Sequence, residues 1–137
     1  WVASPLRERG YRGDNSLESM LYTLATGDDK DRKGLDDVGM RIFLLHRALT
    51  IRGMGTKEMR DRHDRIPAWV FNDKSSKPPF TKGTTRMDHE DVRTALDMFY
   101  DELGWDKATG APTRATYAKF GLDGVGAALA GQDLMPR

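Results

Sequence analysis

One segment of the sequence constrains the fold more than any other, because its apolar residues recur at helical spacing over four turns. The seam consists of Leu35, Val38, Ile42, Leu45 and Leu49, and it is widened by Met40, Phe43, Leu44 and Ala48. This spacing is typical of an amphipathic helix and unlike the strict alternation of a β-strand. We therefore expect a helix that forms the buried centre of the domain. It should end near Arg52, where Gly53 and Gly55 interrupt the pattern.

Shorter stretches with the same periodicity predict helices before and after this one. Asn15 and Glu18 have the spacing of a capping pair at the start of the first helix, and Gly27 suits its end. A later apolar stripe ends at Gly104, and Thr113 can cap a short helix beyond it. No stretch alternates as a strand would. The predicted class is all-α: an irregular helical bundle of about five helices, one central and buried, with long loops.

The domain organisation follows from length and from the positions of Pro and Gly. The chain of 137 residues suits one domain. We expect residues 1–14 to be an entering strap or loop and residues 15–137 to be a helical domain. Residues 72–86 are rich in Pro, Ser, Lys and Thr and should form a long loop. The start Trp1-Val2-Ala3-Ser4-Pro5 lacks an initiator Met and a signal-peptide pattern, so we expect a fragment of a larger protein.

Composition excludes several classes of function. Lys and Arg total 22 against 21 Asp and Glu, so a net charge of +1 gives no electrostatic case for nucleic acid or an anionic membrane. The sequence has no cysteine, so this stretch can supply no disulfide, no thiolate zinc site and no iron–sulfur ligand of its own. No run reaches the 18 or so apolar residues of a membrane span.

The three histidines give no strong signal for a metal or catalytic site. His46 has no acidic or histidine neighbour three or four residues away, so a partly buried structural role is favoured over a ligand. His63 and Asp64 could form a base with its orienting carboxylate, but adjacent residues rarely face each other. His89 lies among acidic residues at a helix start, which favours a solvated helix terminus.

An irregular segment rich in arginine is the most unusual feature of the residues themselves. It contains Arg52, Arg60, Arg62 and Arg65. Such a cluster either grips an anion or the carboxylates of a neighbouring domain, or forms a solvated charged loop, and the sequence leaves both open. Nucleic acid is disfavoured because acidic residues are interleaved. The aromatic residues Tyr100, Trp105 and Tyr117 are expected to pack between the last helices rather than form a stacking platform.

The order of several landmarks resembles the last part of the aldehyde:ferredoxin oxidoreductase family. They are a helix with an Arg-containing turn at 41–53, Asp-Arg-Ile-Pro at 64–67, Phe-Tyr-Asp-Glu-Leu-Gly-Trp-Asp at 99–106, Gly-Ala-Pro-Thr at 110–113 and Phe-Gly-Leu at 120–122. Each is weak alone, but the ordered series across residues 35–122 is fairly specific. The turn after Arg52 reads Gly-Met-Gly where many members carry Arg-Glu-Gly, and Ile66 replaces the commoner Leu.

The resemblance implies a complete cytoplasmic enzyme that oxidises an aldehyde with water to a carboxylic acid and passes two electrons to ferredoxin. It implies a tungsten ion held by two pterin dithiolenes and a four-iron, four-sulfur cluster, all bound by upstream domains of the same chain. We therefore expect no catalytic, cofactor-binding or metal-binding residue in this segment. Its role would be structural: to pack on the cofactor domains and wall the substrate channel. Arg52, Asp64, Arg65 and Trp105 are the candidate domain-docking or channel-lining residues.

Two other interpretations stay open. The chain could be a free-standing helical interaction module that binds an acidic partner through the loop from Arg52 to Arg65. Alternatively, relatives of this family carry out other low-potential reactions, including reduction of aromatic thioesters, and the departures from the motifs allow such a reaction here. The sequence does not indicate the oligomeric state.

Overall fold

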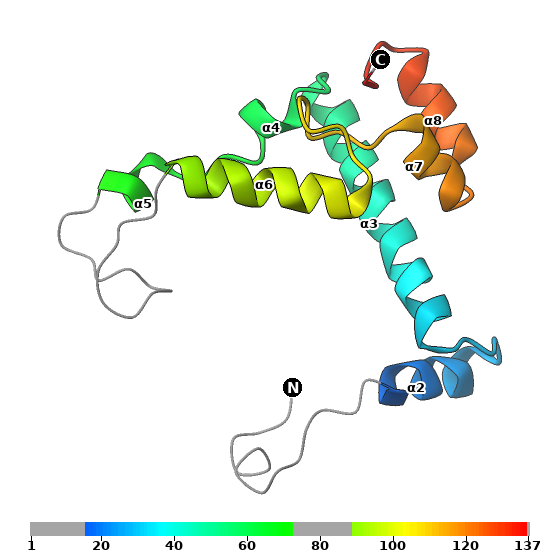
Figure 1. Cartoon of the computed structure of the whole chain (residues 1–137). Helices are drawn as coiled ribbons and strands as arrows, with labels where there is room; N and C mark the ends of the chain where they lie inside the picture. Colours follow the sequence, from blue (N-terminus) through cyan, green and yellow to red (C-terminus); the bar gives the residue numbers. More distant parts are fainter. Residues whose placement is uncertain (1–15, 73–88, 137) are drawn as a thin grey trace, which may run out of the picture. The chain divides into compact units, whose positions relative to one another are not determined.

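A computed structural model describes residues 16–72 and 89–136 of the chain (Figure 1). Its helices are α2 (Ser16–Thr26), α3 (Arg32–Met54), α4 (Met59–Arg62), α5 (Ala68–Asn72), α6 (His89–Leu103), α7 (Arg114–Lys119) and α8 (Asp123–Ala130). The predicted all-α class is confirmed, with seven helices in the described ranges where about five were expected. The predicted strap at 1–14 and the cap at Asn15 lie outside the described residues. So does the loop predicted at 72–86, except for Asn72, which is the last residue of α5.

The chain divides into two compact units, Trp1–Ile42 and Phe43–Arg137, and each is described by itself. In the first unit, α2 ends at the predicted Gly27, whose backbone N–H donates to Thr23 O at 2.8 Å. Asp31 then begins α3, because its carboxylate accepts from the backbone N–H of Gly34 at 2.7 Å. The apolar side chains of α2 are exposed at Leu17, Met20, Leu21 and Leu24.

The part of α3 in the second unit is buried along one edge of the predicted apolar face, the edge that holds Leu44 and Ala48. The buried side chains are Leu44, Arg47, Ala48 and Ile51. In contrast, Leu45 is 39% and Leu49 is 64% exposed. In the first unit, Ile42 is also 64% exposed. The expected burial of these three seam residues is therefore wrong. The physical reason is that apolar residues occupy neighbouring positions such as Leu44 and Leu45. The apolar arc is then wide, and periodicity predicts the helix without selecting which edge of the arc is covered.

The end of α3 lies close to the predicted position. The helix continues two residues past Arg52, to Met54, and Gly55 follows in the left-handed conformation at φ 65°. A side chain at that φ would be strained, which is why glycine ends the helix there. The backbone N–H of Thr56 then donates to Ile51 O at 3.3 Å and closes the turn into the short α4.

The core of the second unit lies among α3, α4, α6, α7 and α8. Its buried apolar side chains are Leu44, Ala48, Ile51, Met59, Tyr100, Trp105, Ala111, Tyr117, Leu122, Leu129, Leu134 and Met135. The predicted cap at Thr113 is confirmed, because its hydroxyl accepts from the backbone N–H of Thr116 at 3.2 Å and begins α7. Helices α7 and α8 lie side by side (Figure 1), with Gly126 directly against the ring of Tyr117.

Candidate functional site

A buried arginine organises the interior of the second unit. Arg47, on α3, is 7% exposed. Its Nη1 donates to Asp64 Oδ1 at 2.7 Å, and its Nη2 donates both to Asp64 Oδ2 and, at 2.6 Å, to the backbone carbonyl of Gly110. A bidentate arginine–carboxylate pair fixes both orientation and distance, because two parallel bonds join two planar groups. Segments 17 and 63 residues away along the chain are thereby fastened to α3.

The carboxylate of Asp64 accepts four hydrogen bonds. Besides the two from Arg47, Tyr100 Oη donates to Oδ2 at 2.7 Å and His63 Nδ1 lies 2.7 Å from Oδ1. A carboxylate offers only acceptors, so we assign a proton to His63 Nδ1. About four lone-pair positions exist on an ionised carboxylate, and all are used here. We call Arg47, Asp64, Tyr100, His63 and Gly110 the Arg47 network.

These contacts decide the charge state of the network. Burial alone would raise the pKa of Asp64, but the hydrogen bonds from Arg47 and its two other donors outweigh burial and lower the pKa to about 2. Burial raises the pKa of Tyr100, and its hydrogen bond to the Asp64 carboxylate raises it further, so the phenol stays protonated. Asp64 is therefore an ionised, fully occupied carboxylate near neutral pH, which suits a structural anchor and not a general base.

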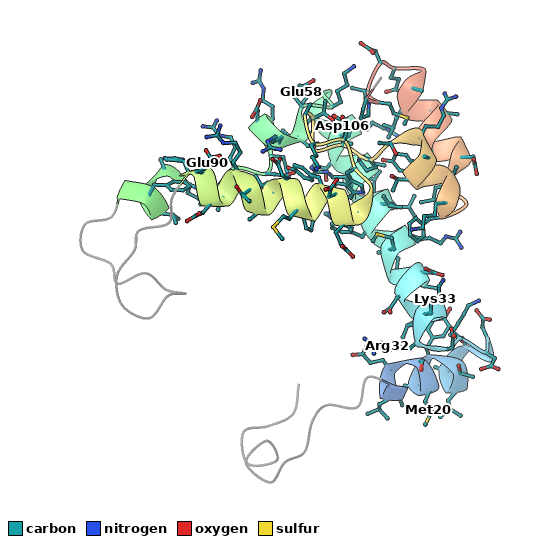
Figure 2. The ribbon with its side chains drawn as sticks, viewed as in Figure 1. Met20, Arg32, Lys33, Glu58, Glu90 and Asp106 are labelled. Carbon is teal, nitrogen blue, oxygen red and sulfur yellow. The ribbon has the colours of Figure 1, made fainter. Side chains whose placement is uncertain are left out.

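The loop between α6 and α7 is shaped to bring the Gly110 carbonyl to Arg47. Asp106, labelled in Figure 2, accepts from the backbone N–H and the hydroxyl of Thr109 at 2.8 and 2.6 Å. The backbone N–H of Gly110 donates to the Asp106 carbonyl at 2.7 Å. Gly110 has φ 69°, and a Cβ there would lie 2.7 Å from Tyr100 Oη. Only glycine allows this approach of the loop to the tyrosine.

An aromatic ring lies against the guanidinium of Arg47. Its Cζ lies 5.0 Å from the ring centroid of Trp105, which is within the range of a cation–π contact. Trp105 is 5% exposed, stacks on Phe43 at 5.4 Å and meets Phe99 edge-on at 6.0 Å. Tyr100 and Tyr117 are fully buried, so the predicted packing role of all three aromatic residues is confirmed.

A second arginine, Arg60, also belongs to the interior. Its Nη1 donates to Asp97 Oδ1 at 2.5 Å and to the carbonyl of Lys107 at 2.7 Å. Its Cζ lies 5.6 Å from the ring of Tyr100. Arg60 therefore joins α4 to α6 and to the loop after α6, and it is not available to bind an external anion.

The structure separates the four predicted site residues into two groups. Asp64 and Trp105 belong to the interior around Arg47, with the Asp64 side chain 14% exposed. Arg52 and Arg65 are exposed, so these two remain the candidates for docking. Sequence reasoning missed Arg47. Its position was the available signal, because Arg47 interrupts an otherwise apolar face one turn after Leu44.

The histidines occupy three different environments. His46 is exposed, so the expected partial burial is wrong. His63 does face Asp64, contrary to the expectation for adjacent residues, but that carboxylate is already paired with Arg47. His89 is exposed at the start of α6, as expected, and stacks on Phe71 at 3.8 Å between centroids.

A groove lies on the opposite side of α3 from the Arg47 network, between α3 and α8. Its volume is about 290 Å³. It is lined by Leu45, Ala48, Leu49 and Arg52 from α3, and by Gly124, Val125, Ala128, Leu129 and Gln132 from α8 and the turn after it. The lining is apolar except for Arg52 and Gln132, so it is suited to covering by another apolar surface and not to acid–base chemistry.

The described residues provide no place for the metal or the cluster that the resemblance implies. Residues 16–72 and 89–136 contain no group of three or more His, Cys, Asp or Glu side chains that could hold a metal ion, and the sequence has no cysteine. Within the same ranges, no helix is both long and apolar enough to cross a membrane. The second unit is a helical scaffold held by charged hydrogen bonds, with an apolar groove between α3 and α8.

Four of the five motifs that carried the resemblance contribute to the Arg47 network. Arg47 comes from the long helix, Asp64 from Asp-Arg-Ile-Pro, Tyr100 from the end of α6 and Gly110 from Gly-Ala-Pro-Thr. The sequence model described as "Aldehyde ferredoxin oxidoreductase, domains 2 & 3" matches residues 3–122. No solved structure matches the chain. Because the family match covers most of the sequence, the chain belongs to the aldehyde ferredoxin oxidoreductase family, in the region of its domains 2 and 3.

Proposed function

We propose that this chain is the helical C-terminal part of a tungsten–pterin, iron–sulfur aldehyde:ferredoxin oxidoreductase of the cytoplasm. The complete enzyme would convert an aldehyde and water to a carboxylic acid, two protons and two electrons, and ferredoxin would accept the electrons. The observation that carries the proposal is the family match across residues 3–122. The convergence of the family's landmark motifs on the Arg47 network supports it.

Within that enzyme the segment would have a structural role. Its described residues do not fit a tungsten or iron–sulfur site, since they contain no cluster of metal ligands. The cofactors would then be held by upstream domains of the same chain, and we assign no catalytic step to the residues described here. What the residues do supply is a scaffold in which α3, α4, α6 and the loop after α6 are joined by charged hydrogen bonds. Such a scaffold can wall a substrate channel without taking part in the chemistry.

The metal content of the complete protein tests the proposed reaction class. The protein would be purified anaerobically from its source and identified by peptides of this segment. We expect tungsten and about four irons per chain, as one four-iron cluster requires, and aldehyde-dependent reduction of ferredoxin. A short chain without tungsten or iron would contradict the proposal and would leave the free-standing interaction module. Molybdenum in place of tungsten would agree with the family but would contradict the proposed metal.

The reaction itself could differ within the family. The Gly-Met-Gly turn after Arg52 and Ile66 in place of Leu depart from the commoner motifs, and they motivate the second candidate, a low-potential reaction such as reduction of aromatic thioesters. Assaying the same anaerobic preparation with aldehydes and with aromatic thioesters distinguishes the two. Activity with the thioester alone would contradict the aldehyde reaction and support thioester reduction.

We further propose that Arg52 and Arg65 hold neighbouring loops of the enzyme. Both side chains are exposed, and arginine is suited to carboxylate recognition. Arg52→Ala and Arg65→Ala in the complete enzyme should each lower the midpoint of thermal unfolding or the metal content. The matched control is Arg62→Ala, which removes another exposed arginine of the same region. Unchanged turnover, metal content and stability in both test variants would exclude this role.

A further inference from the structure

The groove between α3 and α8 has the form of a receptor for a helix. Leu45, Ala48, Leu49 and Arg52 follow the spacing of one helical face. Val125, Ala128 and Leu129 repeat that spacing on α8, and Gln132 continues it in the turn after the helix. Ala48, Ala128 and Gly124 are small, while leucines and a valine stand beside them. Large apolar side chains can therefore enter between the two helices, as in other helix-in-groove complexes.

The apolar side chains of α3 that line the groove are exposed. Leu45 is 39% and Leu49 is 64% exposed, and they form an apolar stripe along about 6 Å of helix. A small ligand in the groove would leave part of this stripe in contact with water. Exposed apolar side chains that lie next to one another often mark an interface with protein. An extended protein segment therefore suits the surface better than a small molecule does.

The charge of Arg52 indicates which kind of residue that protein segment should contain. Arg52 lines the groove, and within residues 16–72 and 89–136 its guanidinium has no hydrogen-bond or ion-pair partner. None of the groove's lining residues is acidic. A symmetric pairing of two copies through the groove would place two Arg52 side chains in one interface without a carboxylate between them, which is unfavourable. The complementary occupant is an apolar helix with an Asp or Glu beside its apolar face.

We propose that the groove receives such a helix from the part of the same polypeptide that lies outside the family's domains 2 and 3. This inference rests on the proposed function, since it requires a longer enzyme chain. The helix inserts large apolar side chains between α3 and α8, and its carboxylate pairs with Arg52 at the edge of the groove. The contact joins the scaffold to the domain that bears the cofactors and covers the exposed stripe of α3.

Site-specific photocrosslinking in the complete enzyme tests the occupant directly. Replacing Leu49 by p-benzoylphenylalanine puts a crosslinker in the groove, and the same replacement of Met98, which is 69% exposed on α6, is the matched control. We expect several-fold more intrachain crosslink from position 49, joined to one peptide outside residues 1–137 that contains Asp or Glu. Crosslinking to a second copy or to a different polypeptide, or yields equal to the control, would overturn the proposal.

A charge reversal gives a second readout that does not depend on the crosslinker. Arg52→Glu should lower the thermal midpoint of the complete enzyme more than Arg62→Glu does, and converting the crosslinked acid to Arg should restore it. No difference between the two reversals, or no restoration, would overturn the pairing. Tungsten and iron in the unsubstituted enzyme are measured separately. Metal present with no crosslink refutes the docking alone, whereas a metal-free short chain refutes the proposed function.

Discussion

Arg47 and Arg52 lie five residues apart on the same helix, yet they have opposite environments. Arg47 is 7% exposed and donates hydrogen bonds to Asp64 and Gly110. Arg52 is exposed on the side of the groove, and the described residues offer its guanidinium no partner. The buried arginine holds distant segments of this chain together. The exposed one occupies a surface that this part of the chain leaves uncovered.

The contrast shows that residue type alone does not identify a docking arginine. A guanidinium that is removed from water needs a carboxylate and carbonyls close to it, because an unpaired buried charge is strongly unfavourable. Arg47 meets that condition within the second unit. An arginine beside apolar groove residues keeps its guanidinium in water while the groove is uncovered. Its contribution to the stability of the protein therefore depends on the surface that covers the groove.

Removing the buried arginine should have the largest effect. Arg47→Ala leaves the Asp64 carboxylate buried without its cation, and we expect the free energy of unfolding of this chain to fall by about 3–5 kcal/mol. Urea denaturation followed by circular dichroism measures the change. Arg52→Ala is the matched control and should change stability by no more than about 0.5 kcal/mol, as for other surface positions. Equal losses in the two variants would refute the contrast between the two arginines.

Acid should weaken the buried pair in a defined pH range. The pKa of Asp64 is lowered to about 2 from its ordinary value of 3.8. A carboxyl with a lower pKa in the folded chain favours folding while it is ionised, so the contribution is complete above about pH 4 and is lost as the pH falls toward 2. We expect the loss from this group to be about 2 kcal/mol. The measurement is urea denaturation between pH 2 and pH 6.

The asparagine variant is the control for this titration. Asp64→Asn cannot titrate, so its stability should change less with pH over the same range than that of the unsubstituted chain. An identical pH dependence in both proteins would show that Asp64 does not hold its low pKa through the Arg47 network.

The sequence predicted the helices and their ends better than it predicted which faces are covered. Gly27, Gly104 and Thr113 bound helices as expected, because glycine conformation and hydroxyl capping act within a few residues. The exposure of Leu49 and the burial of Arg47 could not be foreseen in this way. Burial depends on segments far away in sequence, and Asp64 and Gly110 approach Arg47 only once the chain has folded.

The site was predicted in part for the same reason. The motif containing Asp64 was recognised, but its partner on α3 was not, because an arginine within an apolar stripe can be read as either a surface or an interior residue. Trp105 was placed correctly as a packing residue. In the sequence the arginines between positions 52 and 65 look like one cluster. In the structure Arg60 is paired with Asp97, whereas Arg52 and Arg65 are exposed.

Tyr100 and Tyr117 are both fully buried, but their hydroxyl groups have different environments. Tyr100 Oη donates to Asp64 at 2.7 Å, whereas the hydroxyl of Tyr117 is buried with no hydrogen-bond partner among the described residues. Tyr100→Phe should lower the free energy of unfolding by about 1.5 kcal/mol, because it removes a hydrogen bond to a charged group. Tyr117→Phe should be neutral or stabilising, since it removes an unsatisfied polar atom. A larger loss for Tyr117→Phe in urea denaturation would contradict this assignment.

The smallest effect is expected on the uncovered face of α3. Leu49→Ala should change the stability of this 137-residue chain by no more than about 0.5 kcal/mol, because the side chain is 64% exposed. Leu44→Ala, at a position with 0% exposure on the opposite face, should cost about 2–5 kcal/mol. Urea denaturation of both variants checks the difference.

If the groove is covered in the complete enzyme, Leu49→Ala there should lower the thermal midpoint measurably, since the same side chain would then be buried. An unchanged midpoint in the complete enzyme would mean that this face of α3 stays exposed to water.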